Sequence, residues 1–129
     1  MQKQFFFTAM LFLASFYAQA QYIQVEQVEY IKFNDKVQGF YPRFSPAGDY
    51  IVFSNVNYAG LSSFDLNTRK ITVLTNDLGA GYNTQISADG NSILYNKIEL
   101  VKNMRQNSLV QIDKASKQKV ALTAPSRDA

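Results

Sequence analysis

Two stretches of this chain are copies of each other, and this internal repeat constrains the fold more than any other feature. Residues 34–53 recur 42 positions later as residues 76–95, with the same order of polar, glycine and apolar positions. The pairs that match without change are Asn34 and Asn76, Asp35 and Asp77, Gly39 and Gly81, Ser45 and Ser87, Gly48 and Gly90, and Ile51 and Ile93. A period near forty residues, with a turn and an apolar run in each unit, is typical of a repeat architecture.

The match continues beyond position 95 at a larger offset. The residues that return 48 positions later are Leu61, Asp65, Leu74 and Thr75, which reappear as Leu109, Asp113, Leu122 and Thr123. The six extra residues therefore fall within residues 96–108. Residues inserted between matching segments are expected in loops, because residues inserted into one strand alone would shift its pairing register with the neighbouring strand. We therefore expect a loop at residues 96–108.

Each unit predicts four short antiparallel strands, over residues 40–75 in the first unit and 82–123 in the second. Turn residues such as Gly48 and the pair Asp89-Gly90 separate the runs of apolar residues. At an offset of 42, residues 28–33 align with the fourth strand of a unit. We therefore expect an orphan strand there, which would close a ring in a longer protein.

The first twenty residues predict a signal peptide. Lys3 gives a short positive start, and an apolar run continues to Phe16, before an A-x-A cleavage site that ends at Ala20. The apolar run is too short to cross a bilayer, for which roughly 20 residues are needed. We therefore expect an exported protein with no membrane span after cleavage, and a folded part at residues 21–129.

The turn between the first two strands of each unit carries a resemblance to a known family. Residues 44–54 and 86–96 resemble the WD-like repeat of TolB-type β-propellers, a pattern of roughly F-S-P-D-G-x-x-I-x-F, with Ala47 and Ala88 as departures. The resemblance implies an all-β fold, a partial β-propeller with two four-stranded blades, in a ring of about six or seven blades. We expect a truncated piece of a longer protein, or a ring completed by other chains, because stacked repeats need neighbours.

The composition removes several kinds of site. Histidine and cysteine are both absent from the 129 residues, so there is no Ser-His or Cys-His pair and no histidine or thiolate metal site. The aspartates that recur in both units, Asp65 with Asp113 and Asp35 with Asp77, predict hydrogen bonding in turns, because a calcium site takes about six to eight oxygen ligands. We expect no catalytic residue, no metal site and no cofactor.

Loop residues supply the candidates for partner contacts. Aromatic residues in or beside strands are expected to pack in the core: Phe40, Tyr41, Phe44, Phe53, Tyr82 and Tyr95. Tyr58 differs because it lies in the polar stretch at residues 55–60, and Arg105 lies in the longer counterpart of that stretch in the second unit. Binding residues concentrate on loops held by a rigid scaffold, so Tyr58 and Arg105 are the partner-binding candidates.

These observations favour a non-catalytic binding module. By resemblance to TolB-type proteins, the partner would be a periplasmic or envelope protein or peptide, with a glycan as a further candidate. Thirteen Lys and Arg residues and ten Asp and Glu residues are scattered along the chain, which gives no electrostatic argument for nucleic acid or membrane surfaces. Two alternatives stay open: the propeller of a prolyl-oligopeptidase-like hydrolase whose catalytic domain is absent here, and a truncated fragment without function.

Overall fold

The computed structural model describes residues 25, 27–32 and 37–127. The chain divides into two units, Met1–Lys32 and Phe33–Ala129. In the first unit, residues 27–32 form neither helix nor strand, so the strand expected at residues 28–33 is not formed over its described part. A strand requires a paired neighbour, and the neighbour expected for this one belongs to a further blade. Phe33 and the signal peptide expected at residues 1–20 lie outside the described residues.

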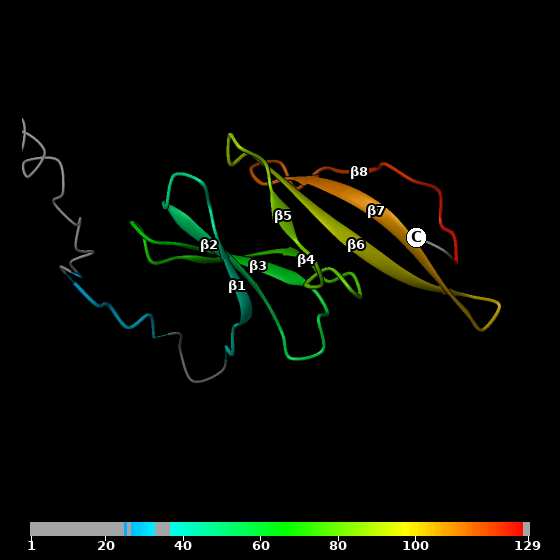
Figure 1. Ribbon diagram of the computed structural model, residues 1–129, viewed down its shortest axis with the longest axis horizontal. Helices are drawn as coiled ribbons and strands as arrows, with labels where there is room; N and C mark the ends of the chain where they lie inside the picture. The colour runs from blue at the N-terminus through cyan, green and yellow to red at the C-terminus, as the bar shows by residue number, and fades with distance from the viewer. Residues whose placement is uncertain (1–24, 26, 33–36, 128–129) are drawn as a thin grey trace, which may run out of the picture. The chain divides into compact units, whose positions relative to one another are not determined.

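The second unit contains two four-stranded antiparallel sheets (Figure 1). The first sheet has the order β1 (Phe40–Phe44), β2 (Tyr50–Ser54), β3 (Leu61–Asp65) and β4 (Ile71–Thr75). The second sheet has the order β5 (Gln85–Ile86), β6 (Ser92–Val101), β7 (Met104–Asp113) and β8 (Lys119–Ala121). Within each sheet, each strand pairs with the next one along the chain, which confirms the expected all-β fold. Over the described residues, no helix has the length and apolar character needed to cross a membrane.

The turn between the first two strands has the same geometry in both sheets. The Gly48 amide donates a hydrogen bond to the Ser45 carbonyl at 3.0 Å, and the Gly90 amide donates to the Ser87 carbonyl at 2.9 Å. Both glycines have a positive φ, 70° at Gly48 and 72° at Gly90, a conformation that costs glycine nothing and other residues about 1–2 kcal/mol. The repeated glycine is therefore the sequence signal of a repeated turn.

The aspartates at the ends of β3 and β7 cap the following turns, as expected. A carboxylate oxygen of Asp65 accepts hydrogen bonds from the amides of Asn67 and Thr68 at 2.9 and 2.8 Å. Asp113 likewise accepts from the amide and the hydroxyl of Ser116, both at 2.7 Å. The bond from the Thr68 amide lowers the pKa of Asp65, and the bond from the Ser116 amide lowers the pKa of Asp113.

The core lies between the two sheets. Tyr50 and Val52 of β2 share one face of their strand, and together with buried residues of the second sheet they form one apolar cluster. Its members are Tyr50, Val52, Leu61, Leu74, Ala80, Ile93, Tyr95, Val110 and Ile112. Side chains of this size each contribute about 1.5–3 kcal/mol when fully buried. The contact between the sheets is therefore the main source of stability in this unit.

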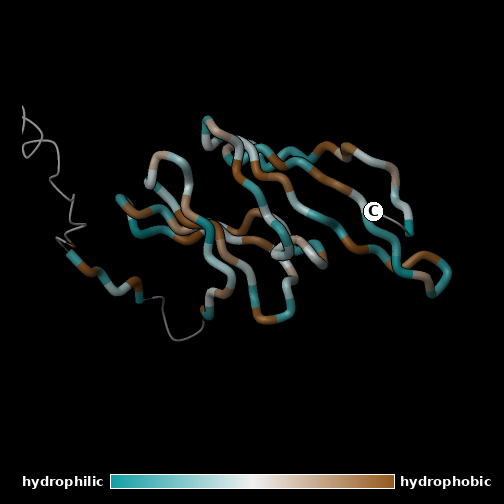
Figure 2. Tube along the Cα trace, in the orientation of Figure 1, coloured by the Kyte–Doolittle hydropathy of each residue, from teal (hydrophilic) through white to brown (hydrophobic). Residues whose placement is uncertain are grey.

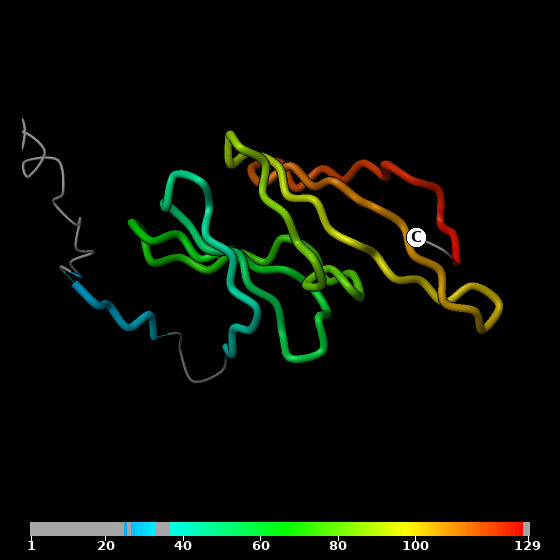
Figure 3. Tube along the Cα trace, in the orientation of Figure 1, coloured from blue at the N-terminus to red at the C-terminus, as the bar shows by residue number. Residues whose placement is uncertain are grey.

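Residues 76–84 link the first sheet to the second (Figure 3). This link packs closely against the connection between β2 and β3: the Gly60 amide donates to the Asp77 carbonyl at 2.8 Å, and the Gly81 amide donates to the Tyr58 carbonyl at 3.1 Å. A Cβ atom at Gly81 would overlap the Cβ and Oγ of Ser54. Glycine at position 81 therefore permits the close approach of these two segments.

The prediction of a loop at residues 96–108 is wrong, because this segment continues the strands β6 and β7. The pairing of β6 with β7 runs without interruption from Ser92 opposite Asp113 to Val101 opposite Met104. Lys102 and Asn103 make a two-residue turn with φ of 51° and 60°, as hairpin turns of this length require. The six extra residues lengthen two antiparallel strands together, so the register of the earlier pairs does not shift.

Candidate functional site

Three tyrosines from separate segments form a cluster at one end of the sheets. We call them the tyrosine cluster: Tyr41 at the start of β1, Tyr58 between β2 and β3, and Tyr82 in the link. The rings of Tyr41 and Tyr58 are stacked, with centroids 4.1 Å apart and an interplanar angle of 15°. Tyr82 meets Tyr58 edge to face, at 5.7 Å and 90°. Stacked and edge-to-face pairs are both favourable arrangements of aromatic rings.

The backbone turns Tyr41 out of the regular strand. The pairing of β1 with β2 is irregular between Phe40 and Arg43, and Tyr41 within that interval has a φ of 56°. Asn83, the equivalent residue in the second unit, has a φ of 53°, so the conformation belongs to the repeat. A bulky residue is a rare occupant of this region. The backbone at Tyr41 is therefore strained, and this conformation places its ring beside Tyr58.

Hydrogen bonds fix the segment that carries Tyr58. The Asn55 side-chain oxygen accepts bonds from the amides of Asn57 and Ala59, both at 3.0 Å. The Tyr58 amide donates to the Asn55 carbonyl at 3.1 Å, and the Tyr58 carbonyl accepts from the Gly81 amide at the same distance. Tyr58 also has a φ of 56°. The ring is therefore held in place before any partner arrives, which lowers the entropic cost of binding.

The cluster is neutral and partly open to solvent. The hydrogen bond with the Tyr41 hydroxyl, followed by burial, raises the pKa of Tyr58, so this phenol stays protonated at neutral pH. Tyr41 is 41% exposed and Tyr82 is 52% exposed. Exposed ring faces beside hydroxyl groups can pack against an apolar surface and exchange hydrogen bonds at its rim. The arrangement is suited to binding and provides no activated nucleophile.

A cavity of about 410 Å³ opens beside the same β2–β3 connection. Its apolar lining includes Phe40, Val56 and Val73, and its polar lining includes Asn55 and Thr75. Its volume falls within the range of small-ligand sites, roughly 300–1,000 Å³. The connection at residues 55–60 therefore lines this cavity and also carries the central ring of the tyrosine cluster.

A second cavity, also of about 410 Å³, lies at the opposite turns and has acidic residues in its lining, among them Asp49, Asp89 and Asp113. Asp49 and Asp89 accept hydrogen bonds from Ser45 and Ser87 of their own turns. Among the described residues, no three acidic, histidine or cysteine side chains are grouped so that they could hold a metal ion. The carboxylates around this cavity therefore act within their turns.

Asp77 departs from the turn role expected for it. Its carboxylate accepts a hydrogen bond from the Tyr95 hydroxyl at 2.6 Å and one from the Lys119 amino group at 2.9 Å. Burial raises the pKa of Asp77. The hydrogen bonds from Tyr95, Lys119 and Thr75 have the opposite effect and together outweigh burial, so the pKa lies below its usual value. Burial, and then the bond to Asp77, raise the pKa of Tyr95. This carboxylate therefore connects the link after the first sheet to two strands of the second sheet. Asp35, its counterpart in the first repeat, lies outside the described residues.

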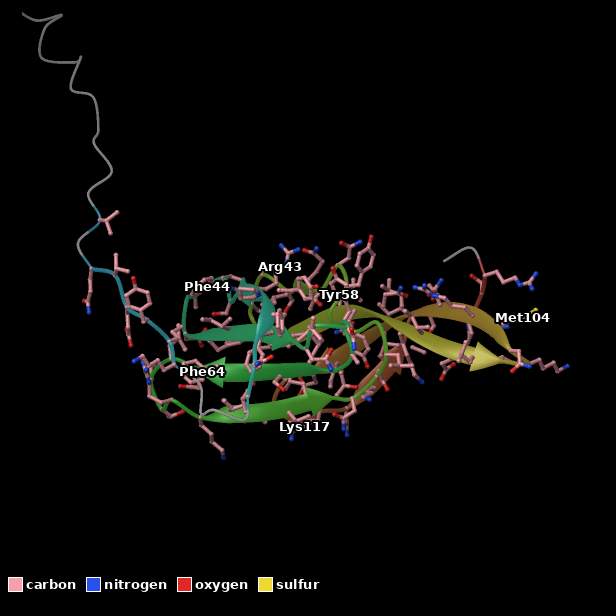
Figure 4. The ribbon with its side chains drawn as sticks, turned by 90° about the horizontal axis from the view of Figure 1, so that it is seen from below. Arg43, Phe44, Tyr58, Phe64, Met104 and Lys117 are labelled. Carbon is pink, nitrogen blue, oxygen red and sulfur yellow. The ribbon has the colours of Figure 1, made fainter. Side chains whose placement is uncertain are left out.

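The structure does not bring the two sequence candidates together. Arg105 is exposed on β7 and pairs across the hairpin with Leu100. In Figure 4, its neighbour Met104 marks the far tip of this hairpin, well away from Tyr58. Tyr58 keeps its place as a candidate contact residue, in the company of two other rings. Arg105 belongs to a different surface.

The sequence reasoning missed Tyr41 and Tyr82, which were expected in the core together with Phe44. Phe44 is 65% exposed at the end of the edge strand β1, whereas the core assignment is correct for Phe53 and Tyr95, at 4% and 1% exposed. The backbone irregularity that displaces Tyr41 leaves no simple sequence signal. Tyr82 carries a weak one, because it directly follows the glycine that allows close packing of the link.

Comparisons with known proteins bear on the fold. No family model matches the chain, and no curated protein matches it. The crystal structure of TolB from Acinetobacter baumannii matches 64% of this chain and 20% of its own chain, with 23% sequence identity and a TM-score of 0.51. The chain has the fold of an open β-propeller segment.

At 23% identity the likeness concerns the fold alone, and the match spans a fifth of the TolB chain. The expected TolB-like propeller fold is confirmed, and the two sheets are two blades of such a fold that do not close a ring. No family model assigns the repeats to a family.

Proposed function

We propose that this chain is a non-catalytic, exported β-propeller segment that binds a protein or peptide of the cell envelope through the tyrosine cluster. The observation that carries the proposal is the stacking of Tyr41 on Tyr58, with Tyr82 and Tyr58 in a T-shaped pair. Tyrosine supplies a large, rigid contact area with few rotatable bonds, and aromatic residues are enriched at the centres of interfaces.

The position of the cluster supports the same proposal. Its three members come from a strand start, a β2–β3 connection and an interblade link, all at one end of the blades. Connections held by a rigid scaffold are where binding residues concentrate. The hydrogen bonds around Asn55 and Tyr58 order this surface in advance, so that binding needs little rearrangement.

The chemistry of the site supports binding without catalysis. The cluster contains neutral phenols, and the whole chain lacks histidine and cysteine, the side chains that most often act as general base or thiolate nucleophile near pH 7. Export is supported by the apolar run and the A-x-A site within residues 1–20. The envelope is therefore the proposed compartment for the partner.

A glycan is the second candidate ligand, because a sugar ring has an apolar face that can stack on tyrosine. The partial exposure of Tyr41 and Tyr82 favours this possibility. A glycan ligand and a peptide ligand can be distinguished by which soluble competitor displaces them from the tyrosine cluster. Soluble oligosaccharides of the envelope would displace a glycan ligand and would leave a peptide complex intact.

The test compares Tyr58→Ala with the wild-type chain. Partners from an envelope fraction are captured by chemical cross-linking and identified by mass spectrometry, and the affinity of each purified partner is then measured by calorimetry. We expect about 30-fold weaker binding for Tyr58→Ala, the effect of losing an interface hot spot worth about 2 kcal/mol. Unchanged affinity in a folded Tyr58→Ala protein would refute the proposal.

Phe44→Ala is the matched control. Phe44 is an exposed aromatic residue on the same strand as Tyr41, at the other end of β1. We expect its replacement to leave binding unchanged. Equal losses for Phe44→Ala and Tyr58→Ala would mean that exposed aromatic side chains bind partners non-specifically, and the tyrosine cluster would then have no special role.

A further inference from the structure

The hairpin of β6 and β7 extends beyond its own sheet. The neighbouring strand β5 pairs with β6 only at Ile93 and Leu94, and β8 pairs with β7 from Val110 to Ile112. Beyond these positions β6 and β7 pair with each other. Their other backbone hydrogen bonds join Ile98 to Leu78, Leu109 to Leu122 and Asn107 to Ser126. Figure 1 shows this end of the hairpin projecting past β5 and β8. We call residues 99–105 the hairpin tip.

The hairpin tip carries apolar side chains on both of its faces. Leu100 is 71% exposed on one face, and Val101 and Met104 are 39% and 37% exposed on the other, because successive residues of a strand point to opposite sides. Figure 2 shows hydrophobic segments beside hydrophilic ones at this tip. A flat protein partner covers one face of a hairpin. Apolar side chains on both faces can be buried together only where the tip is surrounded on all sides, as it would be in a lipid layer.

Folding also gathers positive charge at the hairpin tip. Lys102 lies in the turn and Arg105 follows Met104, both exposed. Arg127 arrives from the C-terminal segment, and its guanidinium contacts the sulfur of Met104. The one acid within the tip, Glu99, is paired with Lys97. The next residue, Asp128, lies outside the described residues.

We propose that the hairpin tip inserts into the headgroup region of an anionic lipid surface. The three apolar side chains would lie below the phosphates, and Lys102, Arg105 and Arg127 would contact the phosphates from the sides. Shallow insertion of apolar residues combined with cationic contacts is how interfacial elements bind anionic membranes. Lys102 and Arg105 are close in the sequence, and the fold adds Arg127 from the C-terminal segment.

This surface is separate from the tyrosine cluster, so it does not depend on the function proposed above. In Figure 4, Met104 and Tyr58 lie far apart. A chain bound to lipid by the hairpin tip would leave the tyrosine cluster accessible to its partner. Tyr58→Ala must therefore leave lipid binding unchanged, and this variant distinguishes failure of one proposal from failure of the other.

The first experiment uses fluorescence. The chain has no tryptophan, so Leu100→Trp gives a unique reporter at the hairpin tip. We expect a blue shift of its emission with vesicles of phosphatidylglycerol and phosphatidylcholine, and none with pure phosphatidylcholine. Val120→Trp is the control, since Val120 is 58% exposed on β8, and we expect no shift there. The absence of a shift for Leu100→Trp with anionic vesicles overturns the proposal.

The second experiment measures sedimentation of the full chain with the same vesicles. We expect Lys102→Gln and Arg105→Gln each to weaken binding about fivefold, the effect of one cation near an anionic surface. Lys117→Gln is the matched control, because Lys117 is also exposed in a hairpin turn, with a φ of 60° against 51° at Lys102. Circular dichroism confirms that each variant is folded.

Three further results would contradict the proposal. Equal binding to anionic and neutral vesicles would remove the role of charge, and equal losses for Lys117→Gln and Lys102→Gln would indicate attraction by the whole protein. The third is a protein partner in place of lipid: a soluble peptide rich in aspartate and leucine binds the wild-type chain and not Arg105→Gln, while anionic vesicles do not bind the chain.

Discussion

The hydroxyl of Tyr95 on β6 donates a 2.6 Å hydrogen bond to the carboxylate of Asp77 in the interblade link. Lys119 of β8 donates to the same carboxylate oxygen at 2.9 Å and to the Thr75 hydroxyl at 2.8 Å. One carboxylate therefore connects the end of the first blade with two strands of the second. In the first blade the position of Tyr95 is occupied by Phe53, whose ring has no hydroxyl to donate.

We predict that Tyr95→Phe destabilises the chain and leaves its packing intact. The ring stays in the core, while the hydrogen bond to a charged acceptor is lost, which costs about 1.5–3 kcal/mol. The free energy of unfolding in urea measures the effect. Tyr82→Phe serves as control, since this ring is 52% exposed and its change should stay within about 0.5 kcal/mol. Equal stabilities of Tyr95→Phe and wild type would show that the hydrogen bond between Tyr95 and Asp77 does not stabilise the fold.

Asp77 also predicts how stability depends on pH. Its folded pKa lies below the ordinary 3.8 because of the bonds from Tyr95, Lys119 and Thr75, which outweigh the effect of burial. A depressed folded pKa contributes stability above the unfolded pKa, and this contribution is lost as the pH falls through the folded pKa. We therefore expect wild type to exceed Asp77→Asn in stability at pH 7, with a gap that closes below pH about 4.

Urea midpoints at pH 7, 5, 4 and 3 measure that gap. Asp65, Asp89 and Asp113 also have lowered pKa values, from hydrogen bonds within their turns, but they are present in both proteins. Their titration therefore cancels in the difference. A gap that stays constant down to pH 3 would mean that the carboxylate charge of Asp77 contributes nothing.

The sequence predicts the blades because their local signals agree with one another. Gly48 and Gly90 mark the same turn, and Asp65 and Asp113 cap the same later turn. Residues 50–53 of β2 form a continuous apolar run, which is typical of a strand covered on both faces. Each signal acts within a few residues, so it can be recognised without knowledge of the packing. This locality is why the four-strand order was predictable in both units.

The extended hairpin and the tyrosine cluster escaped prediction for different physical reasons. The hairpin has a local signal, since Lys97, Ile98, Glu99 and Leu100 alternate polar with apolar residues, but an insertion between matching repeats more often indicates a loop. The tyrosine cluster depends on a displaced residue in β1 and on long-range contacts among three segments. A local pattern does not encode such contacts, so the sequence indicates Tyr58 through its polar loop and gives no comparable signal for Tyr41 and Tyr82.

Gly81 is predicted to be intolerant of even a small side chain. A Cβ atom there would overlap the Cβ and Oγ of Ser54 and would lie 3.2 Å from the Tyr58 Cα. We expect Gly81→Ala to lower the free energy of unfolding by about 1–3 kcal/mol, as overpacking does. Thermal or urea unfolding measures the loss.

The double variant Gly81→Ala with Ser54→Gly identifies the cause. Ser54→Gly by itself loses the bond from its hydroxyl to the Gly60 carbonyl, 2.7 Å long, so it is also destabilising. If the clash with Ser54 dominates, the double variant loses less than the two single variants together, with a coupling of about 0.5–3 kcal/mol. Additive losses would place the strain at Tyr58 instead.

The hairpin tip is predicted to be dispensable for folding. Replacing residues 99–106 by Asn-Gly keeps Ile98 opposite Asn107 and supplies the residues preferred in a two-residue turn. The bond from the Ile98 amide to the Leu78 carbonyl and the bridge from Asn107 to Ser126 both remain. The replaced segment contributes exposed cross-strand pairs and one surface ion pair, Lys97 with Glu99, which is worth about 0–1 kcal/mol.

We therefore expect the shortened chain to unfold in urea within about 1 kcal/mol of wild type, since the core residues at Ile93, Tyr95 and Val110 are untouched. The same chain should lose its binding to anionic vesicles, because Leu100, Met104 and Arg105 are removed together. A loss of more than about 2 kcal/mol on shortening would show that the tip stabilises the blade. The exposed apolar residues would then need a structural explanation, and the case for a lipid-binding tip would fail.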